Sequence, residues 1–590
     1  MSARRRALFF LACTLLAAGV AACAAWRRKP LVPPDVMPWA FDRRQKEPVR
    51  TPAEAKAIAY FLEAELALKE GDRAKALEAL EKAVEADPST PMLRRRLAEL
   101  YVQSRRLRDA LEQCQAALAQ EPEDTQLRLL CAGILSALGK EEEAASEYEE
   151  ILSEDPDAAE AYLLLGALYG ASGDYKRATA VLRRLVKKNP DSYLGYYYLG
   201  QIYARAGDLG KAEKAYKKAL RLNPDAEFLL SALALVYEAK GENDKAIELY
   251  ERILGSNPRS VRARRRLGGL YVGEKRLDEA IEQFRELEKI EADPNEARTK
   301  IGLIYLEKGE YDKAETEFNL VLAAQPDNDQ VRYYLGATLT QKKQYDKALG
   351  VLSLIEPESN YYVDARIQMA YALQRAGRLD EAIDLLHRTL EQKPGEPDVL
   401  ALLASLHREK GDLQAAVETA RALVEVDPEN DRYHFTLGAL YDEAGDKEKC
   451  IEHMRRAIEL NPKNAPALNY LGYTYAERGE NLEEAEELIR RALEISPDDG
   501  YYVDSLGWVY YQRGDYEKAI EYLERAVELA NEDATIVEHL GDAYVRVGRF
   551  RDALRLFRDA IEKAEEKEQI ERLRGKIEEL ENRRGAITGW

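Results

Sequence analysis

The fold is decided by a repeated stretch, which reads YLLLGALYGASGDYKRATAVLRRLVKKNP at residues 162–190 and YYYLGQIYARAGDLGKAEKAYKKALRLNP at residues 196–224, 34 positions later. In both, apolar residues recur three and four positions apart, which places them on one face of an α-helix. Gly-Asp divides each stretch and Pro ends it. Glycine allows the left-handed conformation that ends a helix, and proline cannot continue one. Each stretch therefore predicts two helices joined by a tight turn.

The same unit can be followed along most of the chain. Small residues such as Gly200 and Ala212 let the two helices approach closely, and large Tyr and Leu side chains fill the space around them. By this phasing the units begin near Ala57, Pro91, Thr125, Ala159, Tyr193, Glu227, Val261, Asn295, Asp329, Val363, Pro397, Asp431, Ala465, Gly500 and Ala534. Two extra residues before Pro294, a shortening before Pro357 and an insertion at Asn481 all fall in connections, where insertions are tolerated. The sequence predicts an all-α solenoid of about 15 helix-turn-helix units.

The residues at fixed positions of the unit, such as Tyr162, Leu165-Gly166, Tyr169, Ala178 and Pro190, resemble the tetratricopeptide repeat (TPR) family. The resemblance extends over about 510 residues. It implies a right-handed superhelix whose first helices line a concave surface, the usual place for an extended peptide or a partner helix.

Both ends of the repeat region carry end signals. Thr51-Pro52-Ala53-Glu54 has the form of a capping box with Pro at the first helical position, so a helix is expected to begin there. Residues 566–582 form a charged amphipathic helix with Ile570, Leu573, Ile577 and Leu580 on one stripe. It is expected to cap the last exposed face of the stack. We assign the solenoid to residues 51–564 and the capping helix with its tail to residues 565–590.

The first 22 residues have the form of a signal peptide. Arg4, Arg5 and Arg6 precede an apolar stretch, residues 7–20, that is short for a membrane span. The tetrapeptide Val20-Ala21-Ala22-Cys23 resembles a bacterial lipobox, which implies that Cys23 is lipidated. Ala24 follows in place of the usual inner-membrane retention signal, so the resemblance points to the outer membrane. Residues 23–50 are rich in proline and are interpreted as a tether.

An alternative interpretation of the leader remains open. An uncleaved signal anchor would extend to about Trp26, and the positive charges of Arg27, Arg28 and Lys29 complicate both interpretations because they resist translocation. The anchor would leave the protein at the inner membrane.

The net charge bears on which partners the protein can bind, and the cysteine content bears on whether it contains disulfides. The formal net charge is −20, which disfavours nucleic acid because phosphate contacts need a basic face. Five cysteines in 590 residues are too few for a disulfide framework. Cys114, Cys131 and Cys450 fall at apolar repeat positions and are expected to be small buried residues. A Cys114–Cys131 disulfide is the alternative, since the two lie on consecutive predicted helices.

Candidate binding residues occupy positions two, five, six, nine, twelve and thirteen of each unit, which the core does not explain. In the last units these positions hold Phe435, Asn469, Tyr470, Tyr473, Tyr501, Asp504, Trp508 and Tyr511. Tyr and Trp combine contact area with a polar group, which favours a partner-binding patch. The alternative is that these abundant aromatics pack between repeats. Tyr197-Tyr198 with Tyr333-Tyr334 form a second candidate.

Basic residues at the same positions are a further candidate. Arg262, Arg265 and Arg266, like Arg95 and Arg96, would suit an acidic peptide or a C-terminal carboxylate. The alternative is that they are solvated or pair with neighbouring acids.

Signals of catalysis are not found. His387, His407, His434, His453 and His539 all lie in predicted helices without metal-ligand spacing, and no phosphate loop, dinucleotide turn or nucleophile elbow occurs. We therefore expect no enzyme activity, cofactor, metal or small-molecule substrate.

The favoured function is a lipid-anchored scaffold on the periplasmic side of the outer membrane that binds partner proteins. The segments Asn469-Tyr470-Leu471-Gly472-Tyr473 and Asp504-Ser505-Leu506-Gly507-Trp508 resemble those of outer-membrane TPR lipoproteins. That resemblance implies a periplasmic processing protease as one partner. The alternatives are a structural subunit of a polysaccharide export or pilus assembly machine, and a membrane-anchored cytoplasmic TPR scaffold.

Overall fold

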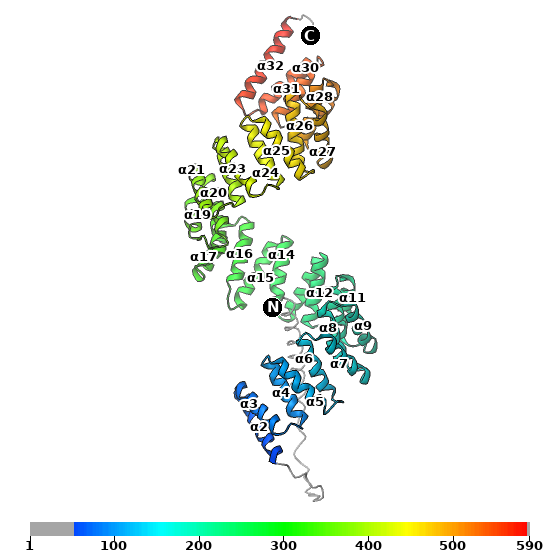
Figure 1. Ribbon diagram of the computed structural model, residues 1–590. Helices are drawn as coiled ribbons and strands as arrows, with labels where there is room; N and C mark the ends of the chain where they lie inside the picture. Colours follow the sequence, from blue (N-terminus) through cyan, green and yellow to red (C-terminus); the bar gives the residue numbers. More distant parts are fainter. Residues whose placement is uncertain (1–51, 531, 587–590) are drawn as a thin grey trace. The chain divides into compact units, whose positions relative to one another are not determined.

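The computed structural model describes residues 52–530 and 532–586, and within these ranges all regular secondary structure is helical (Figure 1). The chain divides into two compact units, Met1–Pro294 and Asn295–Trp590. Residues 1–51, on which the predictions of a signal peptide, a lipidated Cys23 and a tether fall, lie outside the described ranges. Among the described helices, none has the length and apolar character needed to cross a membrane.

The described part of the first unit is a row of fourteen helices that pair into seven hairpins. They are α2 (Pro52–Glu70), α3 (Arg73–Ala86), α4 (Pro91–Gln103), α5 (Leu107–Leu118), α6 (Thr125–Ala137), α7 (Glu141–Glu154), α8 (Ala159–Ser172), α9 (Tyr175–Lys188), α10 (Tyr193–Arg205), α11 (Leu209–Leu222), α12 (Glu227–Lys240), α13 (Asn243–Ser256), α14 (Val261–Gly273) and α15 (Leu277–Ile290).

The described part of the second unit has eight hairpins and a final single helix. They are α16 (Asn295–Glu307), α17 (Tyr311–Ala324), α18 (Asp329–Gln341), α19 (Tyr345–Leu352), α20 (Tyr362–Arg375), α21 (Leu379–Gln392), α22 (Pro397–Glu409), α23 (Leu413–Val426), α24 (Asp431–Glu443), α25 (Lys447–Leu460), α26 (Ala465–Arg478), α27 (Leu482–Ile495), α28 (Gly500–Arg513), α29 (Tyr516–Leu529), α30 (Ala534–Arg546), α31 (Phe550–Lys563) and α32 (Lys567–Ala586).

The predicted repeat starts agree with the observed first helices. Thirteen of the fifteen first helices begin at the predicted residue, and α20 begins one residue early, at Tyr362. The first of them, α2, begins at Pro52, where the capping box places it. The prediction of an all-α repeat solenoid is confirmed.

In several hairpins the turn is formed by a Gly-Asp pair. In the hairpin of α8 and α9, Gly173 has φ 88° and ends α8. The side chain of Asp174 then accepts a hydrogen bond from the backbone N–H of Arg177 and caps α9. At the predicted insertion, Asn481 adopts the same left-handed region with φ 48°. Asparagine tolerates this conformation better than most residues.

Close helix contact explains the small residue at position eight of the unit. A Cβ on Gly200 of α10 would lie 2.6 Å from the ring of Tyr216 on α11. The same holds for Gly541 of α30, where a Cβ would lie 2.5 Å from the ring of Phe557 on α31. The ring fills the space that the missing side chain leaves, so the two helices of a hairpin pack tightly.

The cysteines correct one expectation. Cys114 on α5 and Cys131 on α6 are joined by a disulfide with their Cα atoms 5.6 Å apart, so their interpretation as free buried thiols is wrong. The bond connects the second helix of one repeat to the first helix of the next. Cys450 is a free buried thiol, as expected, and burial raises its pKa to about 12.

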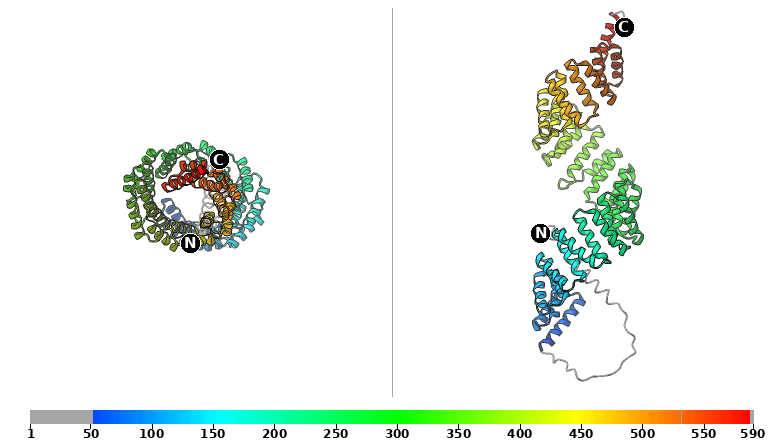
Figure 2. Two further views of the ribbon diagram at one scale, coloured as in Figure 1. Left: turned by 90° about the horizontal axis from the view of Figure 1, so that it is seen from above. Right: turned by 90° about the vertical axis from the view of Figure 1, so that its right-hand side faces the viewer.

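First helices lie on the inner side of the stack. Along much of each unit, neighbouring first helices such as α8 with α10, or α26 with α28, contact one another more closely than neighbouring second helices do. Figure 2 shows the helices of each unit stacked one beside the next. Such a stack curves toward its first helices. Side chains on that side form the surface on which partner binding is expected.

Candidate functional site

The C-terminal aromatic surface consists of the residues at inner positions on α24, α26 and α28: Phe435, Asn469, Tyr470, Tyr473, Tyr501, Asp504, Trp508 and Tyr511. Tyr501 is 57% exposed, and the other aromatics are half-buried. Asp504, by contrast, is 5% exposed. The predicted residues thus form two layers, an aromatic surface and a polar support beneath it.

Trp508 is the centre of the aromatic layer. Its ring stacks on that of Tyr511 with the centroids 4.5 Å apart and on that of His539 of α30 at 4.1 Å. The guanidinium of Arg546 lies 5.6 Å from the Tyr511 ring centroid. Because Trp508 is held on both faces, little side-chain entropy is left to lose when a partner covers its edge.

The polar support is a buried carboxylate–imidazole pair. Nδ1 of His539 lies 3.0 Å from both carboxylate oxygens of Asp504. Burial alone lowers the pKa of His539, but the Asp504 carboxylate raises it more, so the net pKa lies above its usual value. The imidazole is therefore biased toward its charged form, and the pair fixes the ring on which Trp508 stacks.

The α24 and α26 part of the surface is anchored in a similar way. The rings of Phe435 and Tyr470 meet edge to face with their centroids 6.0 Å apart. The Tyr470 hydroxyl donates a hydrogen bond of 2.9 Å to Asp442. Oδ1 of Asn469 is buried and has no hydrogen-bond partner among the described residues. Tyr473 is half-buried near His539, and burial raises its pKa.

The capping helix closes one edge of this surface. Glu538 of α30 is buried and accepts hydrogen bonds from Arg572 at 2.9 Å and from Lys576 at 2.8 Å, both on α32. Burial by itself raises the pKa of Glu538, but these hydrogen bonds lower it by more, so the net pKa is about 2. Lys576 also donates to Asp542 of α30 at 2.8 Å.

Glu538, His539 and Asp542 are functional candidates that the sequence analysis missed. They stand at positions five, six and nine of the last unit, the same inner positions that selected the other residues. Applying that rule to α30 would have found them. Their partners on α32 lie outside the repeat pattern and carried no signal.

The predicted arginine cluster in the first unit is partly neutralised. Arg265 pairs with Glu291 at 2.6 Å and Arg266 with Glu238 at 3.3 Å. Arg262 is exposed and has no ion-pair partner among the described residues. Arg265 and Arg266 therefore pair with neighbouring acids, which is the alternative given for them above.

The second aromatic candidate is two separate clusters, one in each unit. Tyr197 meets Phe228 edge to face at 5.0 Å, and Phe228 is 42% exposed. Phe228 also occupies an inner position, the second of its unit, and had not been singled out. In the second unit, Tyr333 packs against Tyr334 and Tyr361 at 5.8 and 6.1 Å.

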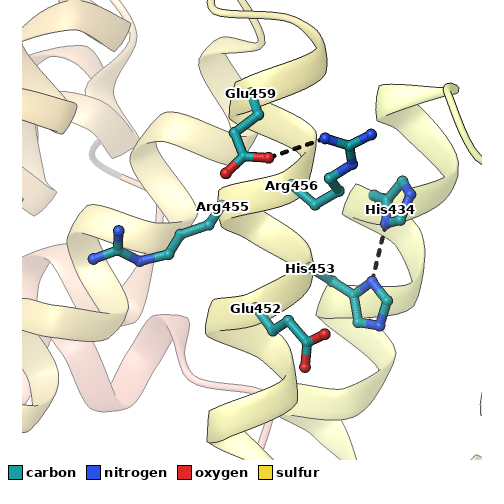
Figure 3. A pocket seen from close by; sticks show the side chains of 6 residues that line it. All are labelled: His434, Glu452, His453, Arg455, Arg456 and Glu459. Carbon is teal, nitrogen blue, oxygen red and sulfur yellow. Dashed lines mark hydrogen bonds and ion pairs between the residues drawn. The ribbon is translucent and has the colours of Figure 1, made fainter.

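Two of the five histidines, His434 and His453, line a cavity of about 440 Å³ in the second unit (Figure 3). Nδ1 of His434 lies 3.0 Å from Nδ1 of His453, and Nε2 of His434 donates to the carbonyl of Pro428. His453 Nδ1 is then the donor and His434 Nδ1 the acceptor. Both Nδ1 atoms and Nε2 of His434 are therefore engaged with each other or with the backbone. Across the described ranges no group of three His, Cys, Asp or Glu residues is placed to hold a metal ion.

Comparisons with known proteins agree with this architecture. Family models described as tetratricopeptide repeat match residues 67–134, 102–168, 163–227, 231–297, 367–431, 431–464, 464–532 and 510–577, and between them cover most of the chain. A model described as anaphase-promoting complex, cyclosome, subunit 3 matches residues 307–389. Among curated proteins, none matches the chain.

Three solved structures are similar over part or most of the chain. MamA protein is 24% identical, covers 30% of this chain and 96% of its own, and has a TM-score of 0.27. The APC/C hetero-tetramer Cut9–Hcn1 is 14% identical over 89% of this chain and 96% of its own, with a TM-score of 0.34. A tetratricopeptide repeat protein from Parabacteroides merdae is 17% identical over 48% of this chain and 99% of its own, with a TM-score of 0.29. On its repeat pattern, its helical hairpins and the family models that match it, the chain belongs to the tetratricopeptide repeat family of protein–protein interaction scaffolds.

Proposed function

We propose that the protein is a scaffold of the bacterial envelope that binds a partner protein through the C-terminal aromatic surface, and that it has no catalytic role of its own. The observation that carries this proposal is Trp508, which is half-buried, fixed between His539 and Tyr511, and close in sequence to the exposed Tyr501. Large aromatic side chains held rigidly at a surface contribute most of the free energy of many protein interfaces.

The chemistry of the surface indicates the kind of partner. Trp508 and Tyr511 offer ring edges, and the phenol of Tyr501 adds a hydrogen-bonding group. Phe435 and Tyr470 add apolar ring surface on the neighbouring helices α24 and α26. An extended peptide with an apolar side chain and a polar group near the Tyr501 phenol fits this combination. A periplasmic processing protease, or a substrate of one, is the partner that the sequence resemblance suggests.

An oxidising compartment is part of the proposal. The Cys114–Cys131 disulfide is buried and links two repeats, and such bonds persist outside the cytosol, where thiols are not kept reduced. This supports a periplasmic location over the cytoplasmic alternative. Lipidation of Cys23 at the outer membrane, or an uncleaved anchor at the inner membrane, would hold the protein there.

Crosslinking in cells, followed by affinity purification and mass spectrometry, tests the binding surface. Trp508→Ala should remove the crosslinked partner or reduce its yield at least tenfold, since a central aromatic hot spot is worth about 2 kcal/mol or more. Tyr522→Ala is the matched control, because this aromatic belongs to the second helix α29, stacks on Tyr510, and is absent from the surface. Equal partner recovery with both variants would refute the proposed site.

Location is tested separately. Labelling with a radioactive fatty acid should modify the wild type and not Cys23→Ser, and membrane fractionation should place the labelled protein in the outer membrane. An unlabelled protein that keeps residues 1–22 would instead establish the signal anchor.

A further inference from the structure

The first helix, α2, carries apolar residues on the side that faces away from its core. Ala57, Ala64 and Ala67 are buried against the neighbouring helices. On the other side, Ile58, Leu62 and Leu66 are 38%, 61% and 56% exposed. These three residues are four positions apart, so they form one stripe along the helix. A helix that is apolar on both sides is normally covered on both sides.

The stripe continues into a groove formed with the next first helix. Met92 at the start of α4 is 53% exposed. A cavity of about 330 Å³ separates it from α2, with Ile58 and Phe61 on one wall and Met92 and Leu93 on the other. Ile58, Leu62, Leu66 and Met92, together with this cavity, are called the α2 groove below.

We propose that the α2 groove is covered by residues 31–41 of the same chain. This segment reads LVPPDVMPWAF and contains seven apolar or aromatic residues, three prolines and one charge. Charged residues flank it, with Arg27, Arg28 and Lys29 before it and Asp42, Arg43 and Arg44 after it. An apolar segment of this length matches an apolar groove that a soluble surface would not otherwise leave open.

The chain length between segment and groove permits this docking. Residues 42–51 are ten residues long and reach up to about 33 Å when extended. Leu66 lies fourteen residues beyond Pro52, which is about 21 Å along the helix axis. The segment can therefore fold back over the whole stripe. Because both parts belong to one chain, the effective concentration is on the order of millimolar, which favours this occupant over a separate molecule.

Charge and proline content favour the same occupant. Beside the stripe, Glu63 lies 3.7 Å from Lys75 and Glu65 lies 2.8 Å from Arg96. Glu70 is exposed and has no ion-pair partner among the described residues. The linker, residues 42–51, carries four basic and two acidic residues and so a net charge of +2. The acids beside the stripe disfavour an anionic lipid surface at this face. Prolines restrict the backbone before binding, so ordering residues 31–41 costs less entropy than ordering a flexible segment.

Site-specific photocrosslinking in the full chain identifies the occupant. A benzophenone amino acid at Leu62 should crosslink to residues 31–41, and Leu354, which is 60% exposed in the second unit, is the matched control position. Mixing isotope-labelled and unlabelled chains separates crosslinks within one chain from crosslinks between copies. Intrachain products at residues 31–41 from position 62 alone support the proposal. Interchain products, lipid adducts, or no product from position 62 overturn it.

Hydrogen exchange gives an independent measurement. Trp39→Asp with Phe41→Asp replaces the two aromatic side chains of the segment with charges and changes no residue of the repeat helices. We expect the amides of α2 to exchange roughly tenfold faster in this variant, while the amides of α6 stay unchanged. Gln45→Asp with Val49→Asp is the control, because it places the same two negative charges in the linker but outside residues 31–41. Equal exchange of α2 in the wild type and the double variant would overturn the proposal.

Discussion

The contact between α30 and the capping helix depends on one buried carboxylate, which makes Glu538→Gln a sharp test. Glu538 accepts from Arg572 and Lys576 of α32, and its pKa is about 2. An unperturbed Glu has a pKa near 4.3, and the difference corresponds to about 3 kcal/mol of stability at neutral pH. Glutamine keeps the shape but loses the charge. Since Arg572 is half-exposed and can be solvated again, we expect a loss of about 2 to 3 kcal/mol.

This loss should appear as local opening of α32 rather than as global unfolding. Amides of α32 should exchange roughly 30- to 150-fold faster in Glu538→Gln, with smaller changes in α31. The effect should depend on pH with a definite sign. Because the pKa of Glu538 is lowered in the folded state, its contribution is complete above about pH 4.3 and is lost as the pH falls through about 2.

The matched control is Glu581→Gln on the capping helix α32 itself. Glu581 accepts from Arg558 at 2.7 Å, but both side chains are exposed, and such pairs contribute little. If the two variants open α32 equally, or if neither does, the buried pair is not what holds the capping helix.

Three further predictions follow from packing, crosslinking and the buried pair. Gly200→Ala should lower local stability in α10 and α11 by about 1 to 3 kcal/mol, because its Cβ meets Tyr216, as hydrogen exchange of these two helices measures. Gly255→Ala on α13, with open space around it, should instead raise the stability of α13 by about 0.5 kcal/mol, as hydrogen exchange of that helix measures. Cys114→Ser with Cys131→Ser should cost about 3 kcal/mol, seen as faster exchange in α5 and α6, and no change would show that the bond is dispensable. His539→Gln leaves Asp504 buried without a cation and should cost about 3 kcal/mol. The pKa of His539 is raised in the folded state, so the stability difference from the wild type should be complete below the unperturbed value of about 6.5. The difference should shrink as the pH rises through the raised folded-state pKa, and thermal unfolding at several pH values checks this.

Repeat boundaries were predictable because they depend on local chemistry. The start of α14 at Val261 and the start of α30 at Ala534 follow from the spacing of apolar residues and from Gly, Asp and Pro at the turns. Each signal acts within one hairpin, so it can be seen in the sequence without knowledge of the neighbouring repeats.

The candidate site was predictable only in part. Inner positions of the unit selected Tyr501, Trp508 and Asp504 together, but they could not separate an exposed side chain from a buried one. Asp504 is buried because His539, 35 residues later, lies against it. The pairing of Cys114 with Cys131 was likewise left as an alternative, since the repeat pattern gives helix faces and not distances between side chains.

By itself, the sequence determined that the chain forms stacked helical hairpins, where each begins, and which faces of the first helices the core does not use. Hydrophobic period and turn residues are sufficient for this, because both act over a few residues. Among the side chains that the hairpin core does not use, only the tertiary structure decided which are buried against a neighbour and which stay exposed. His539, which stacks on Trp508, is an example of the first kind, and the exposed stripe of α2 is an example of the second. Those outcomes depend on contacts between repeats, and their geometry is fixed only when neighbouring hairpins pack.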